Sequence, residues 1–204
     1  ISIIIPCYNV EHTIFNTISA IKESIAACDS DWNWEILAIN DGSTDNTQTI
    51  LTKIEDIKLI NHAANQSLAA ARNTGIKNSA GQYIAFIDAD IEVSKKWFQK
   101  MLTTLMENLN IIGVTGTLKP QPHSKMSPLN KYLFSKYRGQ QNVNNDTVLH
   151  YKSFVFSNTI VQKSILDDVG GFDESLKHYG GEDTEIAIRI KTKFPKGLRK
   201  IKAE

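Results

Sequence analysis

The chain has 204 residues, enough for one large domain or two small ones with a proper hydrophobic core. It contains 41% hydrophobic and 22% charged residues, as an ordinary globular protein does. Its formal net charge of +1 argues against broad nucleic-acid binding, which needs a basic face.

The first half of the chain alternates between strand and helix patterns. Apolar runs predict buried strands at residues 1–5, 35–40, 57–61 and 83–87. Helical spacing predicts helices at residues 11–27, from the turn "DGSTDNT" toward residue 54, at 67–78, and from 95 to about 108. We expect Ser43, Thr44 or Asp45 to cap the second helix and Gly81 to cap the end of the third. This alternation predicts a doubly wound α/β fold with a largely parallel sheet.

The second half is more irregular. A strand at residues 111–118 is followed by residues 119–149, which contain three prolines and the Asn-rich run "NVNND", with one helix expected near 129–138. A strand-like segment, "KSFVFSN", resumes at Lys152, and a helix is predicted at 182–193. Because no Gly/Ser linker separates the two parts, we predict a single domain over residues 1–204, with halves 1–118 and 119–204.

Polar side chains follow three of the predicted strands. Tyr8 and Asn9 follow the first strand, Asp41 the second, and Asp88 and Asp90 the fourth. Parallel strands end at one sheet edge, where open α/β sheets bind their ligands. Each strand end has a plainer alternative: Pro6 as a residue that merely ends the first strand, Asp41 as a turn residue before a helix, and the aspartate pair as a solvated turn. Three such clusters at one edge favour a binding site.

The aspartate pair at residues 88 and 90 suggests a hard divalent cation. Two carboxylates one residue apart repel each other when both are ionised, unless a cation lies near them. Mg²⁺ binds carboxylate oxygens and keeps phosphates and water as its other ligands. The chain has neither a dinucleotide fingerprint nor a P-loop, so a metal with Arg or Lys is expected to neutralise bound phosphates.

Six motifs in order carry a family resemblance: "SIIIPCYN", "INDGSTDNT", "NQSLAAARNTG", "GQYIAFIDADI", "VGGFDES" and "YGGEDTE". They resemble the motifs of the family 2 nucleotide-sugar glycosyltransferases, which have the GT-A fold, and the match runs from Ser2 to about Arg189. The resemblance implies transfer of a sugar from a nucleotide diphosphate donor, usually a UDP-sugar, to an acceptor hydroxyl with inversion at the anomeric carbon. It also implies polysaccharide or glycoconjugate synthesis, with Mg²⁺ or Mn²⁺ as cofactor.

The resemblance assigns a nucleotide site. Pro6, Tyr8 and Glu11 match the pocket around the donor's base and ribose. Asp41 matches the aspartate that hydrogen-bonds uracil, and Arg72 a basic residue near the base or phosphates. From its local sequence alone, Arg72 would be read as a solvated helix arginine.

The resemblance also assigns the metal and catalytic residues. Asp88 and Asp90 match the DXD motif, with Asp88 near the ribose and Asp90 on the metal. Asp183 matches the general base that takes the acceptor's proton, and Glu182 is the second candidate or an acceptor-orienting group. The local alternative is an acidic helix N-terminus favoured by the macrodipole. Phe172 and Tyr179 could offer rings to a sugar, or pack in the core.

The expected partners follow from this assignment. Residues 1–118 would bind the nucleotide-sugar donor, and residues 119–204 a glycan or lipid-linked glycan acceptor. Two other classes compete with the glycosyltransferase. A non-catalytic doubly wound nucleotide-binding or regulatory module is shorter and has no use for "GGEDTE". A sugar nucleotidyltransferase needs a Gly-rich basic loop after its first strand, and "PCYNVEHT" is unlike one.

Cysteine content and hydropathy bear on location. Cys7 and Cys28 are too few for a disulfide framework and favour a reducing cytosol. No apolar run approaches the roughly 18 residues of a membrane span, and no signal peptide is visible. The chain opens on Ile1 within a strand pattern, so we expect a trimmed piece of a longer protein. We therefore predict a cytoplasmic protein, with association at the inner face of the membrane through missing flanks left open.

Overall fold

The computed structural model describes residues 1–29, 31–107, 111–120, 148–176, 180–195 and 197–200, together with residues 128 and 131. Most of the helix predicted near 129–138 lies outside these residues, as does Tyr179. None of the helices within the described ranges has the length and apolar character needed to cross a membrane.

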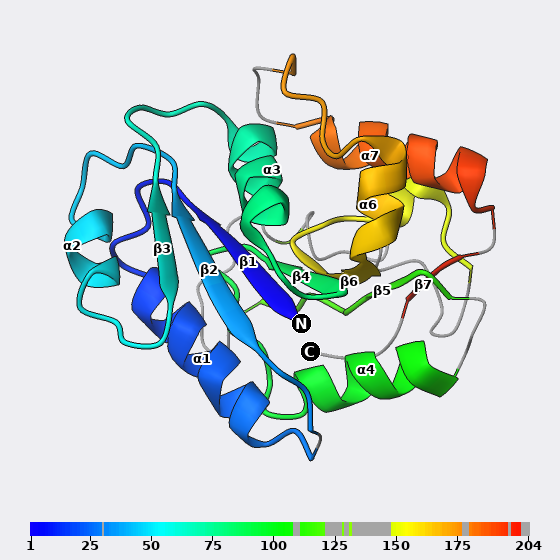
Figure 1. Cartoon of the computed structure of the whole chain (residues 1–204), viewed down its shortest axis with the longest axis horizontal. Helices are drawn as coiled ribbons and strands as arrows, with labels where there is room; N and C mark the ends of the chain where they lie inside the picture. The colour runs from blue at the N-terminus through cyan, green and yellow to red at the C-terminus, as the bar shows by residue number, and fades with distance from the viewer. Residues whose placement is uncertain are drawn as a thin grey trace.

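A seven-stranded sheet forms the centre of the molecule (Figure 1). Its strands, in spatial order, are β3 (Lys58–Asn61), β2 (Glu35–Asn40), β1 (Ser2–Cys7), β4 (Tyr83–Ile87), β6 (Asn158–Gln162), β5 (Gly113–Thr115) and β7 (Leu198–Lys200). β1, β2, β3 and β4 pair in parallel, while β6 pairs antiparallel with both β4 and β5. β7 is parallel to β5, so within this sheet β6 alone is reversed. The predicted α/β, largely parallel fold is confirmed.

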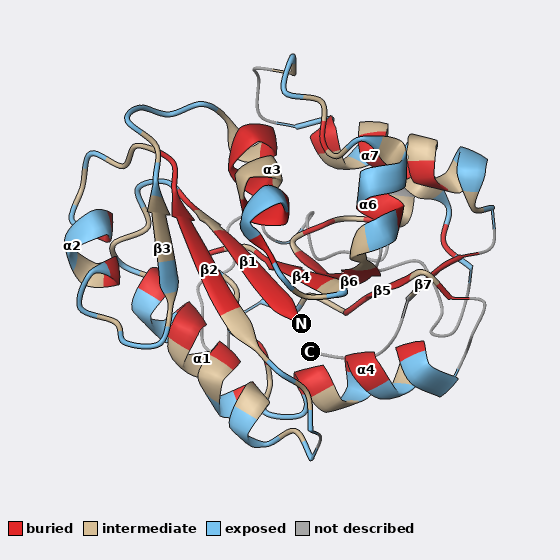
Figure 2. Ribbon diagram, viewed as in Figure 1, coloured by how far each residue is buried: buried red, intermediate tan, exposed pale blue. Residues whose placement is uncertain are grey.

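Helices cover both faces of the sheet (Figure 1). One face carries α1 (Ile14–Ala26), α2 (Thr47–Leu51) and α4 (Trp97–Glu107). The other carries α3 (Leu68–Asn78), α6 (Lys163–Val169) and α7 (Glu182–Lys193), with a short 3-10 turn, η2 (Tyr151–Ser153), beside α7. The central strands are buried, the edge strand β3 is partly exposed, and the outer helix faces are exposed (Figure 2). The sheet separates two hydrophobic cores.

Alternation along β1 divides the isoleucines between these cores. Ile3 and Ile5 pack against α1 and α4, while Ile4 packs on the α3 side. The period of two is that of a pleated strand, and burial on both faces explains why the run is continuously apolar. α3 lies especially close to β1, since a Cβ on Gly75 would approach Ile4 Cγ2 to 2.4 Å.

β1 extends beyond the predicted end and includes Pro6. Ile1 and Cys7 accept hydrogen bonds from β2 and the loop after it, so odd-numbered residues of β1 face β2. Pro6 therefore faces the β4 side, where the β1–β4 ladder has already ended at Ile4. The missing proline N–H interrupts no ladder bond, and the central strand tolerates it.

Several predicted elements have their expected bounds, and others differ. β2, β4 and α7 match the prediction residue for residue. The strand predicted at "KSFVFSN" is wrong: β6 begins only at Asn158, and α6 follows it unpredicted. The reason is tertiary, because the N–H of Phe156 donates to the Asp183 carboxylate (3.1 Å) and both Phe154 and Phe156 are buried in the α3-side core.

Neither predicted cap is found. The N-cap of α2 is Asn46, without a side-chain capping bond, so the expectation of Ser43, Thr44 or Asp45 is wrong. Asp45 precedes the cap and accepts a hydrogen bond from the Thr47 N–H (2.9 Å). Gly81 does not cap α3, which ends at Asn78 with Ser79 extended. Gly81 instead packs on β1, where a Cβ would lie 2.6 Å from the Ser2 nitrogen.

Candidate active site

The loops that follow β1 and β2 are joined by hydrogen bonds at the carboxyl edge of the sheet. Asn9 Oδ1 accepts from the Thr44 N–H (2.8 Å), and Asn9 adopts a positive φ of 52°. Glu11 Oε2 accepts from the N–H and the side-chain amide of Asn46 (2.9 and 2.7 Å). Glu11, predicted to line the donor pocket, thus has one carboxylate oxygen engaged in bracing this loop pair.

Pro6 and Tyr8 lie at the same edge. Pro6 is half-buried and is the second-last residue of β1, where it pairs with Ile39 of β2. Tyr8 follows the strand directly. The Tyr8 side chain is 48% exposed, which is unusual for a large aromatic residue beside a core strand. Its ring is therefore free to contact a ligand at this edge.

Asp41 is buried and satisfied within the protein. Its Oδ1 bonds His62 Nδ1 (2.6 Å) and accepts from the Gln66 N–H (2.9 Å), while Oδ2 accepts from the Ser67 N–H (3.1 Å). His62 Nε2 continues the chain to Thr74 Oγ1 on α3 (2.9 Å). Asp41 thereby fixes the loop between β3 and α3, a role that its sequence position did not indicate.

The β3–α3 loop packs closely against Gly42, in the loop after β2, and its backbone is strained at Ser67. Gly42 has a φ of +68°, and a Cβ there would lie 2.4 Å from the Ala64 backbone. Ser67, the N-cap of α3, has φ 129° and ψ 162°, a region almost restricted to glycine. Its hydroxyl accepts from the Ala70 N–H (3.3 Å). Such strain persists only where the surroundings enforce it, and here Asp41 does so.

Asp88 and Asp90 form a turn directly after β4. The Asp88 N–H donates to Ser157 O (3.1 Å), which ties the turn to β6, and Ala89 O accepts from Thr17 Oγ1 (2.9 Å) on α1. Asp90 is exposed. The two carboxylates therefore differ: Asp88 faces the protein and Asp90 faces solvent.

Arg72 is the electrostatic centre of the site. From α3, its guanidinium donates through Nη1 to Asp183 Oδ1 (2.6 Å) and through Nη2 to Asp88 Oδ1 (3.2 Å). Glu182 Oε1 lies 3.9 Å from Nη1. The side chain is 1% exposed, so the alternative of a solvated helix arginine is wrong. One buried guanidinium therefore joins the DXD segment to the "GGEDTE" segment.

Asp183 and Glu182 open α7. Gly181, with φ +104°, is the N-cap, and Glu182, Asp183 and Glu185 lie in the first turn. Asp183 Oδ2 accepts from the Phe156 N–H (3.1 Å), and Glu182 Oε2 accepts from the Gly180 N–H (3.1 Å). The acidic N-terminus suits the helix dipole as well as catalysis, so the two interpretations coexist.

The charges at this site are unbalanced. Arg72 faces three carboxylates, and Asp90 adds a fourth nearby. Desolvation raises the pKa of Asp88, and the neighbouring charges of Asp183 and Asp90 raise it further, although Arg72 opposes them. Burial lowers the pKa of the Arg72 guanidinium, but Asp183 and Asp88 outweigh that effect and the pKa is raised. The site therefore favours an additional positive charge.

The carboxylates at this site fit a hard divalent cation whose other coordination positions are taken by the phosphates of a bound nucleotide and by water. Asp90 offers a solvent-facing carboxylate and Asp88 lies two residues away, partly exposed at 31%. Among the described residues, no group of three or more His, Cys, Asp or Glu is arranged for a metal. One or two carboxylates completed by phosphates and water is the usual environment of Mg²⁺.

Asn73 is a site-forming residue that the sequence did not single out. Its amide exchanges two hydrogen bonds with the Phe172 backbone (2.8 and 2.9 Å) and a third with Glu174 (2.8 Å). Phe172 itself is buried, its ring packed against Phe86 and Phe156 and 5.2 Å from the Arg72 guanidinium carbon. The packing alternative for Phe172 is confirmed, and a sugar contact by its ring is not.

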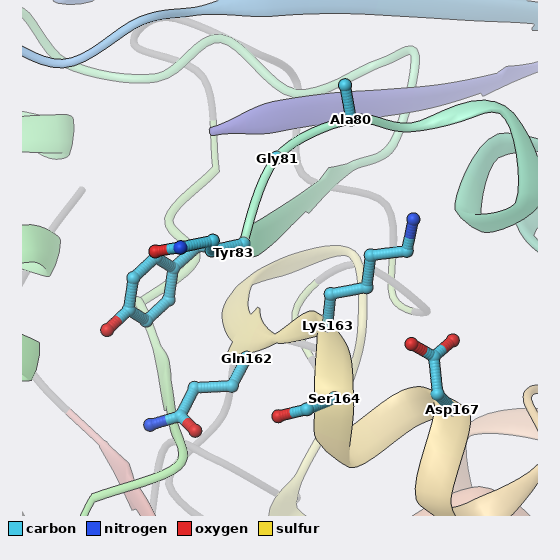
Figure 3. A pocket seen from close by; sticks show the side chains of 8 residues that line it. Ala80, Gly81, Tyr83, Gln162, Lys163, Ser164 and Asp167 are labelled. Carbon is cyan, nitrogen blue, oxygen red and sulfur yellow. The ribbon is translucent and has the colours of Figure 1, made fainter.

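Of two cavities in the described part of the chain, one lies beside these elements and the other lies away from them. One, of about 370 Å³, is lined by Asn65, Gln66, Ser67, Ala70 and Glu174, between the strained loop and the "GGFDES" segment. The other, of about 440 Å³, lies at the opposite end of β4, where Lys163 and Asp167 of α6 line it with Tyr83 (Figure 3). None of the predicted site residues lines this second cavity, because they lie at the carboxyl ends of the parallel strands.

The sheet order and the helices on both faces define a GT-A type α/β fold. Residues 2–170 match the family model described as "Glycosyl transferase family 2", and the chain belongs to this family. It is 36% identical over 115 residues to the Escherichia coli "UDP-Glc:alpha-D-GlcNAc-diphosphoundecaprenol beta-1,3-glucosyltransferase WfgD", covering 55% of this chain and 44% of that one. It is 26% identical to chondroitin synthase of Pasteurella multocida, over 97% of this chain and 23% of the relative. The chain thus spans less than half the length of these curated relatives.

Solved structures share the fold at low identity. S. aureus TarS (residues 1–349) in complex with UDP matches with a TM-score of 0.75 at 19% identity, over 100% of this chain and 58% of that 1–349 chain. The mannosyltransferase PcManGT of Pyrobaculum calidifontis, in complex with GDP-Man and Mn²⁺, matches with a TM-score of 0.66 at 18% identity, over 98% and 53%. These likenesses confirm the GT-A fold.

Proposed function

We propose that the chain carries an inverting, metal-dependent glycosyltransferase that moves a sugar from a UDP-sugar to an acceptor hydroxyl in polysaccharide or glycoconjugate synthesis. The observation that carries this proposal is the meeting of Asp88 and Asp183 on Arg72. A donor-side carboxylate beside the exposed Asp90 and an acceptor-side carboxylate at the start of a helix are the two parts that an inverting displacement needs. Family membership and the UDP complex of TarS support the donor class.

In the proposed reaction, the acceptor oxygen bonds to the anomeric carbon as the bond from that carbon to the diphosphate oxygen breaks. The electron pair leaves with UDP, and the acceptor proton passes to the Asp183 carboxylate. Glu182 orients the acceptor. A divalent cation, when bound, would neutralise the charge of the diphosphate. Asp90 would hold this cation, and Asp88 would lie near the ribose. The Mn²⁺ complex of PcManGT supports this metal requirement.

The donor's nucleoside would bind where the loops after β1, β2 and β3 meet. Tyr8 offers an exposed ring there, with Pro6 and Glu11 beside it. Asp41, which the resemblance assigned to uracil, is buried, so we propose that it supports this site through the loop that it anchors. Residues 1–118 would thus bind the donor and residues 119–204 the acceptor. An undecaprenol-linked acceptor, as named for the E. coli relative, would bring the protein to a membrane, and we propose the cytoplasmic face.

Two substitutions test the catalytic assignment. In Asp183→Asn we expect kcat for UDP release to fall by about 10²–10⁴, the usual effect of removing a general base, while UDP affinity is unchanged. Glu182→Gln should act mainly on the acceptor KM. The measurement is UDP release from a panel of UDP-sugars with Mg²⁺ or Mn²⁺, with GDP-sugars and CDP-sugars as controls for the base.

The outcomes are distinct. If Glu182→Gln is inactive while Asp183→Asn retains turnover, the two roles are reversed. If the wild-type chain binds UDP but releases none from any sugar nucleotide, it is a binding module and not an enzyme.

A further inference from the structure

The Arg72 side chain is enclosed by the protein on all sides. Its side chain is 1% exposed, and its two terminal nitrogens are already bonded to Asp183 and Asp88. Nε is buried without a hydrogen-bond partner among the described residues, and Phe172 lies against the guanidinium. A residue enclosed in this way acts on the ligand through its partners.

Asp183 is held at both oxygens. Arg72 binds Oδ1 at 2.6 Å and the Phe156 N–H binds Oδ2 at 3.1 Å. Because the backbone donor fixes only one oxygen, the guanidinium determines the rotation of the carboxylate about its own axis. The Asp183 side chain remains 21% exposed, so the oriented group still faces the site.

The support behind Arg72 is rigid. Phe172 is clamped by its exchange of backbone hydrogen bonds with Asn73, one residue along α3 from Arg72. The rings of Phe86 and Phe156 pack against Phe172 at centroid distances of 5.6 and 4.9 Å. This packing restricts the guanidinium to one orientation, and a side chain that positions a catalytic group needs such a fixed orientation.

We propose that Arg72 is a positioning residue that orients Asp183 toward the acceptor and couples it to Asp88 on the donor side, without itself binding the donor. This inference rests on the proposed function. It differs from the expectation, drawn from the family resemblance, that Arg72 approaches the base or phosphates. The two interpretations predict opposite effects on UDP affinity.

The test is Arg72→Lys, which keeps the charge but cannot bridge two carboxylates as a planar guanidinium does. We expect kcat for UDP release to fall about 10–100-fold, as a misplacement of about 1 Å can cause. UDP affinity with Mg²⁺, measured by calorimetry, should stay within about twofold, because the lysine ammonium keeps a positive charge beside Asp88. A donor contact would instead show a large loss of affinity with turnover preserved at saturating donor.

A double-mutant cycle decides whether Arg72 acts through Asp183. On the Asp183→Asn background, Arg72→Lys should reduce the residual kcat by no more than about twofold, since residues acting as a unit are not additive. If it costs the same factor as in the wild type, the two residues act independently and the proposal is wrong.

Arg189→Lys is the matched control. Its guanidinium binds Glu185 and the Gly171 carbonyl, and in the described part of the chain it does not bond Asp88 or Asp183, so we expect a lower Tm with kcat preserved. If Arg72→Lys does not fold, Phe172→Leu removes the ring behind the guanidinium and should lower kcat with UDP affinity intact. Normal kcat in that variant overturns the proposal, whereas a wild-type chain without turnover overturns the proposed function and, with it, this role for Arg72.

Discussion

Single side chains at this site serve two purposes, and the arginine shows this most clearly. Arg72 neutralises part of a carboxylate cluster that would otherwise be too negative to bury, and it also links two segments far apart in the chain. With three carboxylates facing one guanidinium, the cluster keeps a net negative charge. A bound cation would reduce that charge, so the same imbalance that costs stability favours ligand binding.

Asp41 gives a prediction at this scale. Asp41→Ala leaves the Gln66 and Ser67 N–H groups and His62 without their acceptor, at a cost of about 1–3 kcal/mol for a buried donor left unpaired. For a chain of this size, each kcal/mol lowers Tm by about 2–4 °C. We expect both a lower Tm by calorimetry and weaker UDP binding, because the loop beside the nucleoside site loses its anchor.

Asp31→Ala, at an exposed aspartate, is the control and should leave Tm unchanged. A variant that loses UDP affinity at unchanged Tm would instead indicate that Asp41 contacts uracil directly and contributes little to the loop.

At the scale of elements, the start of α3 is the strained part of the site. The helix begins at Leu68 immediately after Ser67, whose backbone is held by Asp41 in a conformation suited to glycine. α3 also carries Arg72 and Asn73, so the position of its first turn sets the position of the carboxylate cluster. The strain is therefore located where the site needs a fixed geometry.

Ser67→Gly should stabilise the protein. Relief of a backbone strain of about 1–3 kcal/mol outweighs the entropic cost of glycine, about 0.5–1 kcal/mol, and the loss of the cap, a few tenths. Thermal unfolding should show a rise of a few degrees in Tm. Ser67→Ala, which keeps the strain and loses the cap, should lower it, and a Ser67→Gly variant less stable than the wild type would show that the backbone is not strained.

At the scale of the whole molecule, reversal of one strand unites the two halves. β6 runs antiparallel to β4, so the start of β6 and the aromatic segment before it lie beside the end of β4. That is the edge at which Asp88 emerges, and Asp88 N–H bonds Ser157 O there. The second half of the chain thereby brings α7 and Asp183 to the donor site.

Ligand-induced stabilisation of the whole chain tests the metal assignment. With UDP and Mn²⁺ at about 100 times their Kd, linkage gives about 2.7 kcal/mol, or about 5–10 °C in Tm. Asp90→Asn should abolish the part of this shift that EDTA removes, and should leave the ligand-free Tm intact because Asp90 is exposed. Asp31→Asn, at an exposed carboxylate before β2, is the control. Equal, EDTA-insensitive shifts in wild type and Asp90→Asn would contradict the assignment.

The sequence by itself determined the doubly wound fold, the bounds of β2, β4 and α7, and the edge at which the polar residues gather. Hydrophobic periodicity and strand ends are local properties, so a single segment reports them. The order of the motifs then identified the family, and the match over residues 2–170 confirmed it.

The tertiary structure decided which of these polar residues meet. Nothing in "AARN" shows that Arg72 binds both Asp88 and Asp183, and nothing in "KSFVFSN" shows that Phe156 donates to a helix instead of a neighbouring strand. The sequence likewise did not indicate the contacts that Asn73 and His62 make. Each of these contacts joins residues distant along the chain, and their formation depends on how the sheet is ordered and how closely α3 and α7 pack on it. Local propensity does not encode such distances, so only the folded chain reveals them.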